Sequence, residues 1–389
     1  MKKVCLEVKK MDKEEKIKVL QDIVRIKSVN GNEEEVASYL QQLLKEHRIH
    51  SQLISYSEGR CNLIAEIGSE GPILGFTGHM DVVDAGEEHS WTFPPFEAEI
   101  DGNRLYGRGS TDMKSGLAAM VIAMIELKDT PLKGKVRLLA TVGEEVGELG
   151  AEQLTKLGYA DDLDGLIIGE PTNYNLMYAH MGSLNYSVKA IGKEAHSSMP
   201  EEGINAINLL NQFITRINEK MSEITNKYEN QELGRTIHNV TVIRGGNQVN
   251  SIPGEAVLQG NIRSIPEYDN EQIIELLQTT AEQLTLELDG TLEVTIDYNK
   301  VPVQAKKDSK LIKVIQNQFS EALPLITAAG TTDAAEFTKS DNSFDLVVFG
   351  PGMPKLPHQI DEYVEIDNYL DMIDRYQDIA KEYLSSFFE

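Results

Sequence analysis

Short, continuously apolar runs alternate with helical segments in both terminal parts of this 389-residue chain. The runs have strand length and fall at residues 61–67, 73–77, 136–142, 163–168 and 344–349. A strand that is apolar throughout has to be covered on both faces, as in a parallel sheet between two layers of helices. The sequence therefore predicts an α/β fold with a mixed, mostly parallel sheet flanked by helices.

The segments between these runs have the spacing of helices. Residues 12–48 show helical periodicity, interrupted at 28–32 by a turn after which a second helix begins at Glu33. Residues 113–128 are rich in Ala, Met and Leu, which predicts a long and largely buried helix.

The middle of the chain has a different order of elements. It predicts strands at 183–191, 239–244, 256–263 and 292–298, and helices at 203–220 and 271–288. Their order along the chain is β-α-β-β-α-β, which is typical of a ferredoxin-like α+β domain. We therefore expect an inserted domain at residues 183–298, and a first domain formed by residues 1–182 and 299–389.

Four of the apolar runs lead into a histidine or an acid. These residues are His79, the pair Glu144 and Glu145, Glu170, and His358 in the loop after the last run. Asp112 lies just before the helix predicted at 113–128. Ligands of open α/β sheets bind at the carboxyl ends of the strands, so we expect these side chains to meet there.

Clustered carboxylates repel one another, and burying them unpaired costs free energy. A divalent cation removes both costs, and mixed imidazole and carboxylate ligands suit zinc, cobalt or manganese better than calcium. Each residue taken singly has an ordinary explanation as a loop residue or, for Asp112, a helix cap. Their joint position favours two metal ions with a bridging carboxylate. Asp81, two residues after His79, is placed to accept the second imidazole N–H.

The charge balance limits the kinds of partner. Asp plus Glu number 62 and Lys plus Arg 37, for a formal charge of -25. A field of this sign disfavours nucleic acid and anionic membrane surfaces as partners. It also repels anionic substrates, so a carboxylate-bearing substrate requires local Arg or metal.

Cysteine content and the start of the chain predict a cytoplasmic protein. Cys5 and Cys61 are the only two cysteines, and they form no metal-like or redox pair. The basic start at Met1–Lys3 is followed by further charged residues rather than by the apolar stretch of a signal peptide.

Several motifs resemble a known family. Residues 78–83, 91–96 and 107–114 are closely similar to segments of the co-catalytic zinc family of succinyl-diaminopimelate desuccinylase. That family also holds acetylornithine deacetylase, aminoacylase and the glutamate-releasing carboxypeptidases. The motifs at 195–200 and 330–333 follow in the family's order, and the resemblance extends from residue 12 to the end.

The resemblance implies a role for each residue at the strand ends. One zinc would be held by His79 and Glu170 and the other by Glu145 and His358, with Asp112 bridging them. Asp81 would orient His79, Glu144 would act as general base, and a cis peptide bond would follow Asp112. Cobalt or manganese would be able to replace zinc.

The resemblance also makes the inserted domain a lid and dimerisation domain. His196 would hydrogen-bond the developing oxyanion, within its own subunit or across a homodimer. Asn250 and Arg263 would bind a substrate carboxylate, a group that the planar guanidinium of Arg263 suits. Gly330 and Thr331 would add further donors.

The expected substrate is a small N-acyl amino acid or short peptide whose C–N bond is hydrolysed. A desuccinylase-like deacylase ranks first, although the proline-rich loop at 350–358 departs from desuccinylases. Acetylornithine deacetylase, aminoacylase and a carboxypeptidase or dipeptidase stay as alternatives. A non-catalytic metal-binding homologue is disfavoured because every ligand position and the base position are filled.

Overall fold

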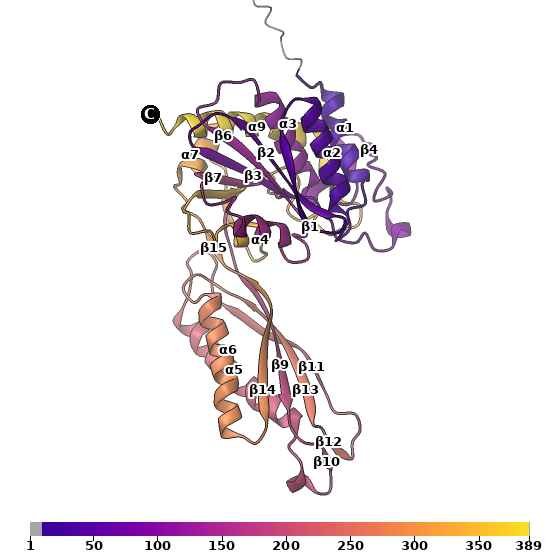
Figure 1. Cartoon of the computed structure of the whole chain (residues 1–389), viewed down its shortest axis with the longest axis vertical. Helices are drawn as coiled ribbons and strands as arrows, with labels where there is room; N and C mark the ends of the chain where they lie inside the picture. The colour runs from indigo at the N-terminus through magenta and orange to yellow at the C-terminus, as the bar shows by residue number, and fades with distance from the viewer. Residues whose placement is uncertain (1–9, 389) are drawn as a thin grey trace, which may run out of the picture. The chain divides into compact units, whose positions relative to one another are not determined.

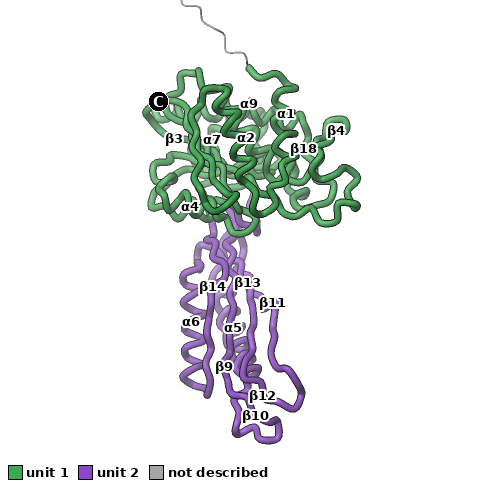
Figure 2. The backbone as a smooth tube through the Cα atoms, turned by 45° about the vertical axis from the view of Figure 1, so that its right-hand side comes forward, with its two compact units in different colours: residues 1–178, 305–326, 332–389 green, residues 179–304, 327–331 purple. Residues whose placement is uncertain are grey.

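The computed structural model describes residues 10–388, which form two compact units. Unit 1 comprises Met1–Tyr178, Ala305–Ile326 and Thr332–Glu389, and unit 2 comprises Ala179–Gln304 and Thr327–Thr331. Figure 2 shows the units in green and purple. Cys5 and the basic start of the chain lie outside the described residues, whereas Cys61 is buried. The catalytic role expected for the first domain, and the lid and dimerisation role expected for the inserted domain, stay predictions.

Unit 1 is built around a mixed sheet. The strands run in the order β1 (Ser51–Ser57), β2 (Arg60–Gly68), β6 (Lys135–Thr141), β3 (Ile73–His79), β7 (Gly165–Ile168), β17 (Asp345–Val348), β8 (Leu176–His180) and β15 (Val303–Gln304), and β16 (Leu325–Ala328) also pairs with β8. At one edge of the sheet, β15 and the last two residues of β8 and of β16 fall within the bounds of unit 2. The four central strands β6, β3, β7 and β17 are parallel, and strand pairs nearer the edges are antiparallel. This confirms the predicted fold class.

The apolar runs form the buried centre of this sheet. Every residue of β3 and of β7 is buried, as their continuous hydrophobicity predicted. The edge strand β1 was not predicted, because its residues are only half-buried or exposed and carry no apolar run.

Helices cover the sheet of unit 1 (Figure 1). Their bounds are α1 (Lys13–Arg25), α2 (Glu33–Glu46), α3 (Ser115–Leu127), α4 (Leu149–Lys156), α7 (Lys310–Asn317), α8 (Ala334–Phe337) and α9 (Ile366–Ser385). A capping box starts α1, since Asp12 accepts from the N–H of Glu15 and Glu15 accepts from the N–H of Asp12. Almost every residue of α3 is buried, and α3 packs along α9. No helix within residues 10–388 is both long and apolar enough to cross a membrane.

A small three-stranded sheet brings distant segments of unit 1 together. It pairs β18 (Tyr363–Glu365) with β5 (Arg104–Tyr106), and β5 with β4 (Ile100–Asp101). The segment just before β18 therefore lies beside the segment just after β5.

Unit 2 has the ferredoxin-like topology that the sequence predicted. Its antiparallel sheet has the order β11 (Ile237–Gly245), β13 (Glu255–Arg263), β9 (Ser183–Ile191) and β14 (Thr291–Lys300). The helices α5 (Ala206–Lys227) and α6 (Asn270–Glu287) share one apolar core with the sheet. Two further short strands, β10 (Ala195–His196) and β12 (Ser251–Ile252), pair with each other.

Three glycines let main chains touch where the strands of unit 1 end. A Cβ on Gly116, in the first turn of α3, would lie 1.9 Å from the carbonyl oxygen of Gly169. A Cβ on Gly350, just after β17, would lie 2.2 Å from the same oxygen. Gly169 directly precedes Glu170, so this close packing fixes where the Glu170 side chain begins.

We expect Gly116→Ala to lower the free energy of unfolding by about 1–3 kcal/mol, because the added methyl group forces α3 away from the Gly169 carbonyl. Urea unfolding followed by circular dichroism measures the change. Gly330→Ala is the matched control, since a Cβ there would meet nothing within 4 Å. Equal stability of the two variants would contradict the close packing described here.

Candidate active site

Asp112 is presented by a tight turn, Ser110–Lys114, that leads into α3. The turn follows Gly109, whose φ of 85° is readily adopted only by glycine. The peptide bond between Asp112 and Met113 is cis, as the family resemblance implied. Asp112 lies in the middle of this turn, shortly before the buried helix α3 begins at Ser115.

The first group of side chains surrounds the imidazole of His79 at the end of β3. His79 Nε2 lies 3.0 Å from Asp112 Oδ1 and 3.4 Å from Glu170 Oε1. His79 is 1% exposed. One imidazole nitrogen and two carboxylates thus meet in a buried position.

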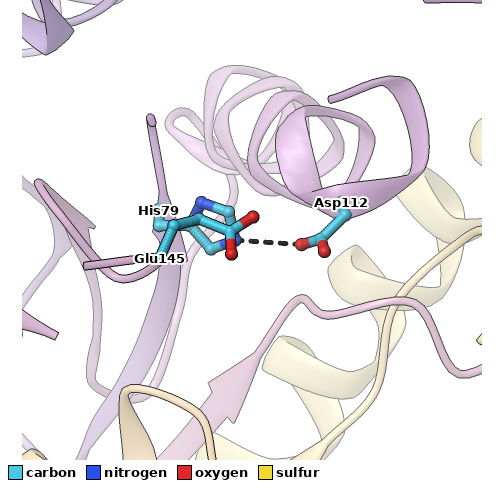
Figure 3. Close-up of side chains that lie close together, drawn as sticks. All are labelled: His79, Asp112 and Glu145. Carbon is cyan, nitrogen blue, oxygen red and sulfur yellow. Dashed lines mark hydrogen bonds and ion pairs between the residues drawn. The ribbon is translucent and has the colours of Figure 1, made fainter. Parts of the chain in front are cut away.

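The second group surrounds His358. Its Nε2 lies 3.0 Å from Glu145 Oε2 and 3.5 Å from Asp112 Oδ2. The two carboxylate oxygens of Asp112 therefore face different imidazoles. Figure 3 shows His79, Asp112 and Glu145 close together, and their ligand atoms lie within 4.8 Å of one another.

Asp81 supports both groups, but its contact with His79 differs from the expected one. His79 Nδ1 donates to the main-chain oxygen of Asp81 at 2.9 Å, while the carboxylate Oδ1 is 3.6 Å away. The carboxylate instead accepts from the N–H groups of Glu144 at 3.1 Å and Glu145 at 3.2 Å. The donated Nδ1 proton leaves Nε2 of His79 as the nitrogen able to bind a metal ion.

The cluster shifts the pKa values of its members in opposite directions. Burial raises the pKa of Glu170 to about 8, and the charge of Asp112 adds to that effect. Hydrogen bonds that His358 donates to the carboxylates of Asp112 and Glu145 raise its pKa to about 10. For His79, burial lowers the pKa, but the charge of Glu170 and the hydrogen bond with Asp112 outweigh burial and raise it well above its usual value.

Glu144 directly precedes Glu145 in this loop, and its carboxyl group belongs to neither ligand group. Burial raises its pKa well above the usual value, and the negative charges of Glu170 and Glu145 add to this effect against the opposing charge of His79. A carboxyl group with a raised pKa beside a polar cluster is suited to accept and return a proton.

The donor set fits divalent metal ions. Two imidazoles and three carboxylates face one another, and burial together with the negative charge of Asp112 raises the pKa of Glu170 so that it holds a proton at neutral pH. Cations in place of those protons would satisfy all five groups, and imidazole with carboxylate is the donor mixture of zinc and related ions. Asp112, with one oxygen toward each imidazole, has the position of a bridging ligand.

Sequence comparison identifies the family. Residues 75–382 match peptidase family M20/M25/M40. This chain belongs to the M20 family. A probable succinyl-diaminopimelate desuccinylase of Staphylococcus aureus is 42% identical over 400 residues, covering 95% of this chain and 98% of the relative. An acetylornithine deacetylase of Buchnera aphidicola is 32% identical over 308 residues, covering 78% and 79% of the two chains.

Solved M20 structures share the fold. The M20 metallo-carboxypeptidase Sso-CP2 of Sulfolobus solfataricus has a TM-score of 0.77 at 21% identity, covering 96% of this chain and all of its own. The dinuclear metal-binding peptidase YXEP of Bacillus subtilis has a TM-score of 0.72 at 16% identity, covering 96% and 98%. At these identities the likeness concerns the fold alone.

The remaining predicted site residues of this M20 protein belong to unit 2. His196 is exposed in β10, and its Nδ1 accepts from the N–H of Ser198 at 3.2 Å. Because β10 pairs with β12, His196 lies opposite Ser251, the residue that follows Asn250 in the chain. Arg263 ends β13, and the segment that contains Gly330 and Thr331 completes unit 2. Their joint action with the cluster of unit 1 stays a prediction.

The sequence did not single out Glu362, which contacts the turn that carries Asp112. Glu362 is fully buried and accepts hydrogen bonds from the N–H groups of Thr111 and Asp112. An acid just before the short strand β18 was the available signal. It is weak, because acids are frequent throughout this chain and nothing local shows burial.

We expect metal affinity to increase with pH up to about 8, the pKa of Glu170, and less steeply up to about 10, the pKa of His358. Below pH 8 Glu170 and His358 both carry a proton in the metal-free protein, and the pKa of His79 is raised as well. The two bound ions must displace these protons, so binding releases at least two protons. Titration calorimetry at pH 7 in buffers of different ionisation heat measures this release. Binding without proton release would show that Glu170 and His358 are not ligands.

Proposed function

We propose that this chain is a zinc-dependent deacylase that hydrolyses the amide bond of an N-succinyl amino acid, with succinyl-diaminopimelate as the first candidate. The relatives with this name are 40–42% identical over nearly the whole chain. The acetylornithine deacetylase of Buchnera aphidicola, with 32% identity, is less similar.

The position of Asp112 carries the proposal. Its Oδ1 faces the imidazole of His79, which also contacts Glu170. Its Oδ2 faces the imidazole of His358, which also contacts Glu145. Two ligand sets that share one carboxylate are the arrangement of a co-catalytic metal pair. We propose zinc at both positions, with cobalt or manganese able to replace it, because the imidazoles and carboxylates suit all three.

The chain's own residues then divide the work. Two bound divalent ions would supply Lewis acidity toward the attacking water and the amide carbonyl. Glu144 would take a proton from that water and return it to the leaving nitrogen as the C–N bond breaks. Asp81 would keep Glu144 and Glu145 in register, because its carboxylate binds the N–H groups of both. The products are the acid and the free amine, so atoms and charge balance.

Residues of unit 2 would bind the rest of the substrate. We propose that His196 donates to the oxyanion, and that Arg263 and Asn250 hold a substrate carboxylate, with Gly330 and Thr331 as further donors. A guanidinium offers the positive charge that an anionic substrate needs in a protein of charge -25. A homodimer through unit 2 and a cytoplasmic location are parts of the same proposal.

A substrate panel tests the activity. We expect the highest kcat/KM on N-succinyl-diaminopimelate among four amides: that compound, N-acetylornithine, N-acetylmethionine and a glutamyl-terminated peptide, each with added zinc or cobalt. A preference for one of the other three would assign the chain to the deacetylase, aminoacylase or carboxypeptidase alternative. Turnover of none would refute the enzymatic proposal and favour a metal-binding homologue.

Two neighbouring glutamates separate proton transfer from metal binding. We expect Glu144→Ala to keep its metal and to lose about 10²–10⁴-fold in kcat, the size of a general-base effect. Glu145→Ala is the matched control, because Glu145 contacts His358 and its loss is expected to lower metal content. Metal analysis after dialysis and steady-state kinetics measure both. The opposite pattern would mean that the two roles are exchanged.

A further inference from the structure

Glu362 gathers four hydrogen bonds on a fully buried carboxylate. Its Oε2 accepts from Arg108 Nη1 at 2.6 Å and from the N–H of Gly109 at 3.1 Å. Its Oε1 accepts from the N–H of Thr111 at 2.8 Å and of Asp112 at 3.0 Å. The carboxylate therefore binds three main-chain donors of one turn, together with the guanidinium at the start of that turn.

The main chain around Glu362 strengthens the same contact. The N–H of Gly107 donates to the carbonyl oxygen of Glu362 at 2.9 Å, and the hydroxyl of Thr111 donates to the carbonyl oxygen of Tyr363. Pairing of β18 with β5 sets this register. The turn is thus held from one side by a single segment that lies about 250 residues further along the chain.

The same segment carries the second imidazole. His358 lies four residues before Glu362, and it contacts Asp112 Oδ2 and Glu145. Asp361, between them, accepts from the N–H of Thr92 at 2.7 Å. One short stretch therefore presents His358 and also holds the main chain from which the Asp112 carboxylate extends.

We propose that Glu362 is a positioning residue that aims the Asp112 carboxylate at both imidazoles and thereby sets metal affinity. A bridging carboxylate has to place two oxygens at once, so a small rotation of its main chain costs both contacts. Glu362 binds the N–H of Asp112 itself, which restrains that rotation directly. This inference rests on the proposed function, because it assumes that Asp112 binds metal.

A second buried carboxylate offers a matched control for the general effect of removing a charge from a buried ion pair. Glu126 is also almost fully buried, is paired with Lys16 at 2.8 Å, and accepts from Gln377. It lies near the end of α3 opposite to the Asp112 turn, about 16 Å along the helix at 1.5 Å per residue. Glu126→Gln thus removes a comparable buried charge without touching the turn.

The test compares zinc affinity in the full-length variants Glu362→Gln and Glu126→Gln, by competition with a chromophoric chelator. We expect Glu362→Gln to weaken zinc binding about 10- to 100-fold, the usual effect of losing a group that orients a ligand. Glu126→Gln is expected to bind zinc like the wild type, while both metal-free variants melt at similarly lowered temperatures. Equal zinc affinity of Glu362→Gln and the wild type, or equal weakening in both variants, overturns the inference.

Glu362→Asp covers the case in which Glu362→Gln does not fold. It keeps the negative charge but withdraws the carboxylate by one methylene, so we expect a similar loss of zinc affinity and an altered visible spectrum of the cobalt-substituted protein. An unchanged affinity and spectrum in Glu362→Asp overturns the inference. Failure of the proposed function is distinguishable, because then the wild type and Asp112→Ala bind zinc equally poorly, and the inference falls with it.

Discussion

The crowding of carboxylates around Asp112 is the constraint on which the rest of unit 1 depends. Asp112 contacts the imidazoles of both His79 and His358, Glu170 contacts that of His79, and Glu145 contacts that of His358. Like charges gathered so closely repel one another. Two further buried acids stand behind them, yet these have main-chain partners: Asp81 binds the N–H groups of Glu144 and Glu145, and Glu362 binds those of the Asp112 turn. The negative charges of Asp81 and Glu362, the two outer acids, are therefore stabilised by hydrogen bonds within the protein. Those of Asp112, Glu145 and Glu170 need cations.

This arrangement requires main chains to approach very closely at the carboxyl ends of the central strands. The parallel strands β3, β6, β7 and β17 all end at one edge, and the loops that follow them share a small volume. Glycines at 116, 169 and 350 permit this approach, because a Cβ at the first or the last of them would collide with a carbonyl oxygen. The sheet thus places the main chain from which the ligand side chains extend. Asp81 and Glu362 then orient that main chain through hydrogen bonds to its N–H groups.

Much of this was predictable because it is encoded locally. The uniform hydrophobicity of β3 and β7 identifies buried parallel strands, and the strand ends then place His79 and Glu170 at one edge. The β-α-β-β-α-β order likewise identified the ferredoxin-like sheet. The missing parts depend on tertiary approach: the edge strand β1 has no apolar run, and the partners of Glu362 are about 250 residues away. That His79 donates to the main-chain oxygen of Asp81 follows from loop conformation, which residue type does not reveal.

The stretch from His358 to Tyr363 sets a fixed spacing between two sets of contacts. Its first residue contacts Glu145 and Asp112, and its last two residues hold the turn before α3. A single inserted or deleted residue inside it would break one set of contacts while keeping the other. The proline-containing stretch at 350–357, by contrast, is bound at Gly350 and Gly352 and half-buried or exposed beyond them. The length of the loop before His358 is therefore expected to vary among relatives. The number of residues from His358 to Glu362 is expected to be invariant among relatives that retain both Asp112 and Glu362.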